Sequence, residues 1–153
     1  MTIVLQATGS GAVCREILVE LPEWFGVESA NDDYVAKAET HETLVAFNDG
    51  RAVGLLTLLT HSPSAAEIYL LAVRRALHRR GIGRALVVEA ESLLRGRGCE
   101  FLQVKTLSPS REDAGYAKTR RFYEALGFHW LEEFPTLWGP NDPALQMIKH
   151  LST

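Results

Sequence analysis

The stretch "HRRGIGRAL", residues 78–86, decides the fold, because it places two glycines one residue apart after three basic side chains. A glycine-rich turn that leads into a helix can direct several backbone N–H groups at one anion, since glycine has no Cβ atom to keep the anion away. Taken alone, the same pattern is also typical of a tight turn whose arginines are solvated. The residues on either side decide between a phosphate site and a plain turn.

An apolar strand is predicted before the turn and an amphipathic helix after it. Residues 65–74, "AAEIYLLAVR", are mostly aliphatic. The helix is predicted to begin near Gly83 and to end at the glycines of "RGRG", residues 95–98. Its apolar face consists of four residues at helical spacing, namely Leu86, Ala90, Leu93 and Leu94.

Two other phosphate-binding designs fail on the residues that they require. A Walker A loop needs Lys and then Ser or Thr after its last glycine, and this chain has Arg84 and Ala85 there. A Rossmann turn needs a third glycine, where this chain has Leu86, and an acidic residue where the next strand ends in Lys105. An apolar strand, a basic loop, G-x-G and an amphipathic helix form the one design that fits throughout.

This unit resembles the coenzyme-binding motif of the GNAT superfamily of N-acetyltransferases, which bind acetyl-coenzyme A. The family's pyrophosphate motif reads [Q/R]-x-x-G-x-[G/A], and the chain offers "HRRGIG" at residues 78–83, departing from it at His78. In "AEIYLLAV", residues 66–73, Glu67 stands where several members of the family carry a catalytic carboxylate. The resemblance therefore extends into the strand before the turn.

A second segment resembles the closing helix and strand of the same family. In "RRFYEALGFHWLEE", residues 120–133, Tyr123 stands where a tyrosine commonly lies near the coenzyme sulfur. The asparagine that is usual earlier in this helix is replaced by Tyr116. Together the matching segments cover about residues 65–133, in the order that the family has them.

The resemblance implies one α/β domain over residues 1–153. Its sheet would be mixed, mostly antiparallel and twisted, with six to seven strands flanked by helices and with central strands that splay apart to admit the coenzyme. The sequence pattern agrees, since Asn48-Asp49-Gly50 is a strong hairpin signal between two apolar runs. Strands are predicted at 2–6, 42–61 (a hairpin), 65–74, 99–106, 128–134 and 143–151, and helices at 29–39, 83–98 and 116–126. A further helix is predicted in the segment 10–26, starting at Ser10 and broken by Pro22 and Gly26.

The expected coenzyme contacts lie on the strand before the turn and on the turn itself. Backbone amides of residues 79–84 and the helix N-terminus suit the pyrophosphate, and the loop arginines can add charge-assisted hydrogen bonds. Strand backbone can pair with the pantetheine amides as an added strand would. The predicted coenzyme-binding residues are Leu71, Ala72, Val73, Arg79, Arg80, Gly81, Ile82, Gly83 and Arg84. Arg74 and Arg75 are interpreted as a solvated face.

Acetyl transfer to an amine requires a proton acceptor and a proton donor. An alkyl amine with a pKa of about 10.4 is protonated at neutral pH, so a carboxylate, acting directly or through water, has to accept its proton. Glu67 is the predicted base. The alternative is that Glu67 is a solvated residue at the start of the strand and that a chain of water molecules accepts the proton in its place. Tyr123 is predicted to protonate the departing thiolate; the alternative is a core aromatic on an amphipathic helix. Tyr116 and Trp138, the latter in the loop "LWGPND" at 137–142, are predicted to line the acceptor site.

Composition excludes several other classes of protein. With 16 Lys+Arg against 19 Asp+Glu the net charge is −3, so no global positive field indicates a nucleic-acid or membrane partner. Two cysteines, Cys14 and Cys99, form neither a disulfide framework nor a metal-ligand pattern, so no metal is expected. The N-terminus lacks the basic start of a secretory signal, and no run of 18 apolar residues occurs, so a cytoplasmic protein is expected.

The predicted function is acetyl-CoA-dependent N-acetylation of the primary amine of a small molecule, by direct attack on the thioester. Acetyl-CoA would be the cosubstrate, and the protein would act as a monomer or homodimer. Two alternatives remain open at this point. One is acetylation of a protein N-terminus or lysine, and the other is a non-catalytic acetyl-CoA-binding module.

Overall fold

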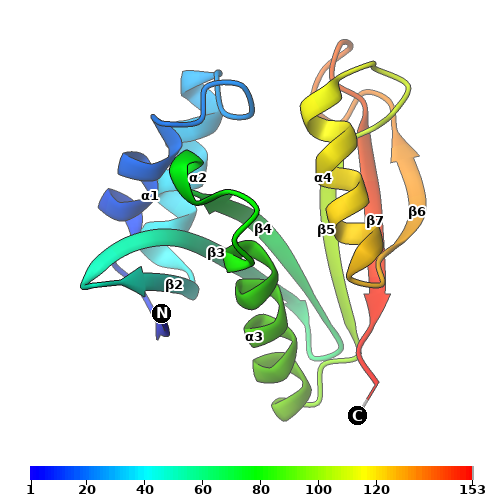
Figure 1. Ribbon diagram of the computed structural model, residues 1–153. Coiled ribbons are helices and arrows are strands. Elements are labelled where there is room, and N and C mark those ends of the chain that lie inside the picture. Colours follow the sequence, from blue (N-terminus) through cyan, green and yellow to red (C-terminus); the bar gives the residue numbers. More distant parts are fainter. Residues whose placement is uncertain (153) are drawn as a thin grey trace.

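A computed structural model of the protein describes residues 1–152. Its strands form one seven-stranded sheet in the order β1-β2-β3-β4-β5-β7-β6 (Figure 1). Every neighbouring pair is antiparallel except β4 and β5, which are parallel and are joined by a helical crossover. The strands are β1 (Thr2–Gln6), β2 (Thr43–Asn48), β3 (Arg51–Ser62), β4 (Ala65–Val73), β5 (Phe101–Leu107), β6 (His129–Phe134) and β7 (Ala144–His150).

Four α-helices and one short 3₁₀ turn complete the described fold. They are α1 (Gly11–Leu18), α2 (Glu28–Thr40), the 3₁₀ turn η1 (Arg75–Leu77), α3 (Ile82–Gly96) and α4 (Ala114–Ala125). None of the helices within residues 1–152 combines the length and the apolar character that a bilayer crossing requires. The element order and the mixed sheet confirm the predicted α/β architecture, and α1 ends at Leu18, a few residues before the predicted break at Pro22.

The two central strands diverge, as predicted. Residues Ala65–Ile68 of β4 pair with Phe101–Val104 of β5, and the pairing stops there. Beyond this point β4 stays with β3 as far as Val73, and β5 stays with β7 as far as Leu107. The register between β3 and β4 shifts at Tyr69, which has no partner in β3, so a β-bulge marks the start of the splay.

The sheet has a hydrophobic core on each face, but the two cores differ in extent. On one face α3 and α4 cover strands from β2 to β7, and the cluster includes Leu56, Leu86, Leu102 and Met147. On the other face α1 and α2 cover β2, β3 and β4 only, through Ile17, Leu55, Leu70 and their neighbours. Strands β5 and β7 therefore have one helix-covered face and one face without a described helix, and β6, whose residues are nearly all exposed, forms the edge of the sheet (Figure 1).

A buried ion pair joins the two halves on the side of α3 and α4. The Lys149 ammonium of β7 donates to both carboxylate oxygens of Glu91 on α3, at 2.9 and 3.0 Å. It also donates to the Leu126 carbonyl oxygen at the end of α4, at 2.7 Å. Because Glu91 is buried, this contact fixes β7 against both helices.

Candidate active site

The turn before α3 has the backbone conformation that the glycine pattern predicts. Arg79 and Gly81 both have positive φ, 64° and 80°, and Gly81 is the N-cap residue of α3. No side chain caps this helix end, so its first backbone N–H groups point away from the protein without a side-chain acceptor. A helix end of this kind carries partial positive charge and favours an anion.

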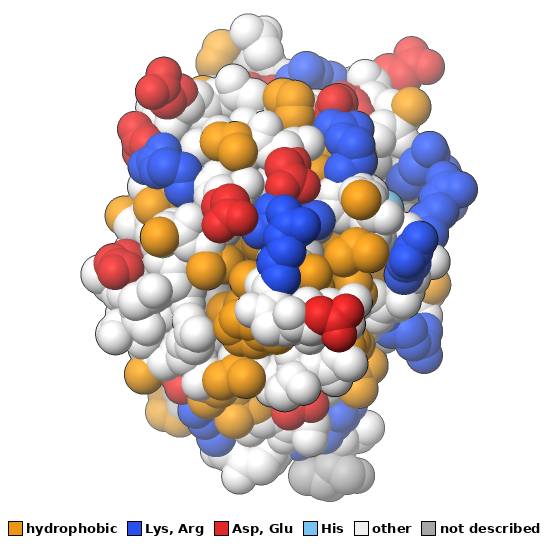
Figure 2. All heavy atoms as spheres, turned by 60° about the vertical axis from the view of Figure 1, so that its left-hand side comes forward, with side chains coloured by type: hydrophobic (Ala, Val, Ile, Leu, Met, Phe, Trp, Pro, Cys, Tyr) orange, Lys and Arg blue, Asp and Glu red, His pale blue; other side chains and the backbone are white. Residues whose placement is uncertain are grey.

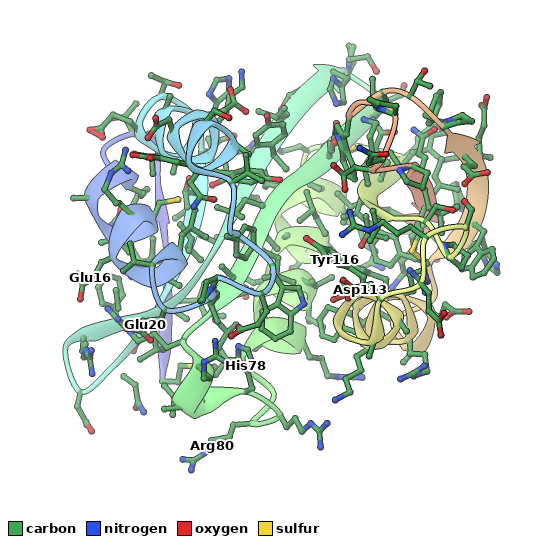
Figure 3. All side chains as sticks on the ribbon, turned by 90° about the horizontal axis from the view of Figure 1, so that it is seen from above. Glu16, Glu20, His78, Arg80, Asp113 and Tyr116 are labelled. Carbon is green, nitrogen blue, oxygen red and sulfur yellow. The ribbon has the colours of Figure 1, made fainter. Side chains whose placement is uncertain are left out.

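Three arginines surround this helix end. Arg79, Arg80 and Arg84 are exposed, and no ion pair involves them in the described part of the chain. Figure 3 shows Arg80 extending away from the body of the protein. On the face drawn in Figure 2, Lys and Arg side chains gather along the right-hand edge, whereas both signs of charge alternate elsewhere. The basic character of this acidic protein is therefore local.

Gly81 and Gly83 differ in what they make possible. A Cβ atom on Gly81 would meet no atom within 4 Å, so its positive φ is the reason for a glycine. A Cβ atom on Gly83 would lie 3.4 Å from Cζ of Phe122 on α4. That distance is an ordinary van der Waals contact, so the packing against α4 does not itself require a glycine, and the role of Gly83 in backbone approach to a pyrophosphate stays a prediction.

The free edge of β4 contains Leu71 and Val73 but not Ala72. The Arg74 N–H donates to the Val53 carbonyl oxygen at 2.9 Å, so Arg74 directs its backbone toward β3. Alternate residues of an antiparallel strand direct their hydrogen-bonding groups to opposite sides, so Ala72 also faces β3. Leu71 and Val73 face the side from which β5 has diverged, so no strand pairs with their backbone there, although the Val73 carbonyl oxygen contacts His78.

His78 stands where the chain departs from the family's pyrophosphate motif, and it contacts the free edge of β4 at Val73. Its Nε2 atom lies 2.7 Å from the Val73 carbonyl oxygen, and its ring stands edge-on to the Trp24 indole, with 5.7 Å between centroids. The Tyr116 hydroxyl donates to the Trp24 carbonyl oxygen at 3.0 Å. In Figure 3, His78 lies between the region of α1, with Glu16 on the helix and Glu20 just after its end, and the beginning of α4. Trp24 therefore links the turn at the end of β4 to α4 across the splay.

Tyr116, predicted to contact the acceptor, is half-buried, and its hydroxyl is occupied by the hydrogen bond to Trp24. Burial raises its pKa to about 12, so the phenol stays protonated and donates its hydrogen bond at neutral pH. Asp113 caps α4 by accepting from the Tyr116 N–H at 3.0 Å, which explains why the helix begins before the predicted residue 116. Gly115 lies against the Trp24 indole, since a Cβ atom there would be 3.2 Å from Nε1.

Tyr123 is buried on α4 with 4% of its surface exposed. Its ring packs edge-on against Phe122 and Phe128, with centroids 5.1 and 5.3 Å apart. Burial raises the pKa of the phenol above its ordinary value, so the proton stays on the hydroxyl at neutral pH. Tyr123 is thus part of the core and also a protonated donor, so the two interpretations of this residue are compatible.

Glu67 is buried on β4, in the last segment that pairs with β5. Its Oε1 atom lies 2.6 Å from Nε2 of His61, on β3. The Lys105 ammonium of β5 donates to both carboxylate oxygens, at 3.3 and 3.2 Å. The carboxylate is therefore neither solvated nor unpaired, and the alternative of a plain surface residue is wrong.

Sequence spacing did not point to His61 or Lys105. His61 reaches Glu67 across a hairpin, and Lys105 reaches it across the parallel pair β4–β5, 38 residues further along the chain. A neighbouring side-chain bond, from Gln146 of β7 to Gln103 of β5, lies on the same sheet face as this group. These polar side chains occupy the face of β5 and β7 that α1 and α2 leave uncovered.

Arg74 and Trp138 differ in burial, and Arg74 also differs from its predicted environment. Arg74 is not solvated, because only 4% of its surface is exposed; its guanidinium donates to Glu16, Glu20 and the Ala52 carbonyl oxygen. Trp138 is 44% exposed in the loop between β6 and β7. The structure does not bring Trp138 into contact with the other predicted site residues in residues 1–152.

The two best-defined surface hollows lie away from the predicted residues. One, of about 530 Å³, lies beside the end of α4 and the start of β6, and the other, of about 580 Å³, lies between α1 and α2. Neither is lined by the β4 edge or by the loop before α3. These two hollows therefore do not contribute to the candidate site.

Comparison with known proteins agrees with this geometry. Residues 12–128 match the family model described as the acetyltransferase (GNAT) family. The match covers more than half of the chain, from α1 through the helix that carries Tyr123. The protein therefore belongs to the GNAT family of acetyltransferases, and it is an acyltransferase.

Solved structures with the same fold cover nearly the whole chain. A GNAT-family acetyltransferase from Desulfovibrio desulfuricans has 19% identity and a TM-score of 0.84, over 99% of this chain and 100% of that one. An aminoglycoside 6'-N-acetyltransferase complexed with coenzyme A has 18% identity and a TM-score of 0.75, over 100% and 98%. The ribosomal-protein-S18-alanine N-acetyltransferase from Escherichia coli has 18% identity and a TM-score of 0.73, over 99% and 96%. No protein of curated function matches the sequence.

Proposed function

We propose that this acetyltransferase transfers the acetyl group of acetyl-CoA to the primary amine of a small molecule by direct attack. The observation that carries the proposal is the placement of Glu67. It is a buried carboxylate on the strand whose next residues, Leu71 and Val73, present a free backbone edge. An acid–base residue and a thioester-binding edge on one strand are what a direct transfer requires.

The coenzyme would be held by backbone more than by side chains. Leu71 and Val73 would pair with the pantetheine amides as an added strand does. The turn at Gly81 and the uncapped start of α3, with Ile82 and Gly83 in its first turn, would receive the pyrophosphate. Arg79, Arg80 and Arg84 would add charge-assisted hydrogen bonds, since no described carboxylate pairs with them.

The proton balance assigns separate roles to Glu67 and Tyr123. An ammonium acceptor loses one proton to Glu67 and becomes a nucleophile, and its nitrogen then attacks the thioester carbonyl carbon. When the C–S bond breaks, the Tyr123 phenol donates its proton to the thiolate and recovers the second amine proton. The products are the N-acetyl amide, the free thiol of coenzyme A, and one proton on Glu67.

The contacts of Trp24 favour a small acceptor over a peptide. Trp24 joins the α1–α2 connection to His78 on one side of the splay and to Tyr116 on the other. A bridge at this end narrows the approach to the β4 edge. The fold match does not decide between the two classes, since an aminoglycoside N-acetyltransferase and a ribosomal-protein-S18-alanine N-acetyltransferase both share the fold over nearly the whole chain.

The experiment is a thiol-release assay with acetyl-CoA and a panel of primary amines: an aminoglycoside, spermidine, tyramine, and a peptide with a free N-terminal alanine. We expect release with at least one small amine. Glu67→Gln should lower turnover by about 10²-fold or more and remove the acidic limb of its pH profile. Glu89→Gln, on the exposed face of α3, is the matched control. Release with the peptide alone would contradict the assignment to small amines.

A further inference from the structure

The pair His61–Glu67 is the most specific polar contact that the proposed chemistry leaves unused. Their atoms Nε2 and Oε1 are 2.6 Å apart, and the side chain of His61 is 42% exposed whereas that of Glu67 is 7% exposed. Glu67 therefore reaches solvent chiefly through the imidazole. His61 stands at the end of β3, next to the hairpin that leads into β4.

A buried base needs an outlet for its proton. Under the proposed function, on which this inference rests, Glu67 gains one proton in every turnover and has to lose it before the next. Lys105 bonds the same carboxylate, but an ammonium has donors only and takes no proton. An imidazole has one nitrogen that accepts and one that donates, and it changes its charge near neutral pH.

We propose that His61 holds the Glu67 carboxylate in place and carries its proton to solvent. The proton moves from Glu67 Oε1 to Nε2 of the imidazole, and the proton on Nδ1 leaves from the exposed side of the ring to water. Glu67 returns to the carboxylate and His61 to a neutral imidazole that now carries its proton on Nε2. Proton exchange between the partly exposed ring and water restores the Nδ1–H tautomer before the next turnover, so each turnover releases one proton. His61 is a positioning residue, because it acts on the amine only through Glu67.

The other charged and titratable groups around Glu67 cannot take this role. Lys105 approaches from β5 and pairs with the carboxylate. Tyr69, the bulge residue of β4, donates its hydroxyl proton to Asp33 of α2, and the Lys37 ammonium lies 5.7 Å from the centre of its ring. Burial raises the pKa of Tyr69 well above its ordinary value, and Tyr34 of α2 is shifted in the same direction for the same reason. Both phenols therefore stay neutral where histidine titrates.

The test is turnover of His61→Ala in weakly buffered solution, with acetyl-CoA and the small amine of the panel that the wild type acetylates fastest. We expect kcat to fall about tenfold or more and added imidazole to restore it in a saturable way, because the exposed position leaves room for a free imidazole. The KM for acetyl-CoA should stay unchanged. His129→Ala, on β6, removes an exposed histidine outside the site and should behave like wild type with and without imidazole.

A second variant separates proton transfer from positioning. His61→Gln keeps a side chain able to donate a hydrogen bond to Glu67 but has no group that exchanges protons, so it should stay slow and its pH profile should differ from wild type. Wild-type turnover in His61→Gln, or loss in His61→Ala that imidazole does not restore, would overturn the inference and leave the proposed function standing. A wild-type protein that releases thiol with no amine would overturn both.

Discussion

The two halves of the sheet are built differently, although they share one core. Strands β2, β3 and β4 have apolar packing on both faces, from α1 and α2 on one side and α3 on the other. Strands β5 and β7 have helix packing on one face, and their other face carries linked polar side chains. Under the proposed function, the first half would provide a fixed edge for the coenzyme and the second half an open face for the acceptor.

The boundary between the halves is where the proposed chemistry falls. Glu67 belongs to the first half by its strand and is bonded to the second half through Lys105. Tyr123 belongs to the single helix that covers the second half. A reaction that needs a fixed thioester and a variable acceptor benefits from one rigid side and one accessible side, so changes on the two sides should have different effects.

The largest effect is expected from Tyr123→Phe, which removes one hydroxyl from the second half. We expect turnover to fall by about 10²-fold, the usual scale for a positioned acid, while acetyl-CoA affinity stays within about twofold. The free energy of unfolding should change little, because no residue within 1–152 hydrogen-bonds to this hydroxyl. Steady-state thiol release and calorimetric titration provide the two measurements.

Tyr34→Phe is the matched control, since it removes a hydroxyl from a tyrosine packed against the core of the first half. Its turnover should match wild type. Equal turnover in both variants would leave Tyr123 with a packing role alone.

A smaller effect, on stability, is expected from Arg74→Met in the first half. The guanidinium is buried and donates to the Ala52 carbonyl oxygen and to the carboxylates of Glu16 and Glu20, so its loss should cost about 2 kcal/mol of the free energy of unfolding. The neighbouring variant Arg75→Met removes an exposed pair with Glu23 and should cost much less. Urea unfolding of both variants measures the difference; similar losses would mean that burial of Arg74 contributes nothing.

A substitution at the start of α3 tests the predicted pyrophosphate site, with a smaller expected effect. Gly81→Ala places a Cβ atom in open space but on a residue with φ of 80°, a conformation that costs about 1 kcal/mol for a residue other than glycine. If the turn has to keep this shape to receive the pyrophosphate, acetyl-CoA should bind about fivefold more weakly. Gly96→Ala, at the other end of the helix and also in open space, should leave binding unchanged in the same calorimetric titration.

The smallest effect is the pH dependence of stability that comes from Cys14, a fully buried residue of α1. Burial raises the pKa of this thiol to about 12, so the folded state holds its proton more tightly than the unfolded state does. The stability that this provides is complete below pH about 8.5 and is lost as pH rises above it. Relative to Cys14→Ala, the wild type should lose about 1 kcal/mol of unfolding free energy between pH 7.5 and 9.5, measured by urea titration. A pH-independent difference between the two proteins would contradict the buried-thiol assignment.

Local patterns predicted most of the fold. The hairpin of β2 and β3 follows from the turn signal at Asn48-Asp49-Gly50, and Asp49 and Gly50 do adopt the positive φ values that such a turn needs. Helix α3 follows from apolar spacing, and its N-cap from Gly81. These features depend on residues close together in the chain, which is why the sequence alone was sufficient.

Contacts between residues on different strands and helices could not be predicted in the same way. Whether the backbone hydrogen-bonding groups of Leu71 or those of Ala72 point toward β3 depends on the bulge at Tyr69. One extra residue in β4 changes the direction in which the backbone groups of each later residue point. The carboxylate partners of Arg74 lie 54 and 58 residues earlier, one on α1 and one just after its end. The group of His61, Glu67 and Lys105 requires three strands in register. In each case the deciding information is a pairing that no single segment encodes.

The strand order also has a consequence for how the chain is made. Strand β6 pairs with β7 alone, and β7 lies between β5 and β6. On a ribosome, residues 129–134 would emerge before the only strand they can bind, and until residues 144–150 follow they would expose Trp130 and Leu131 beside an unpaired backbone. The nascent chain would therefore pass through a short interval in which an exposed, apolar strand edge is available to chaperones or to other unfinished chains.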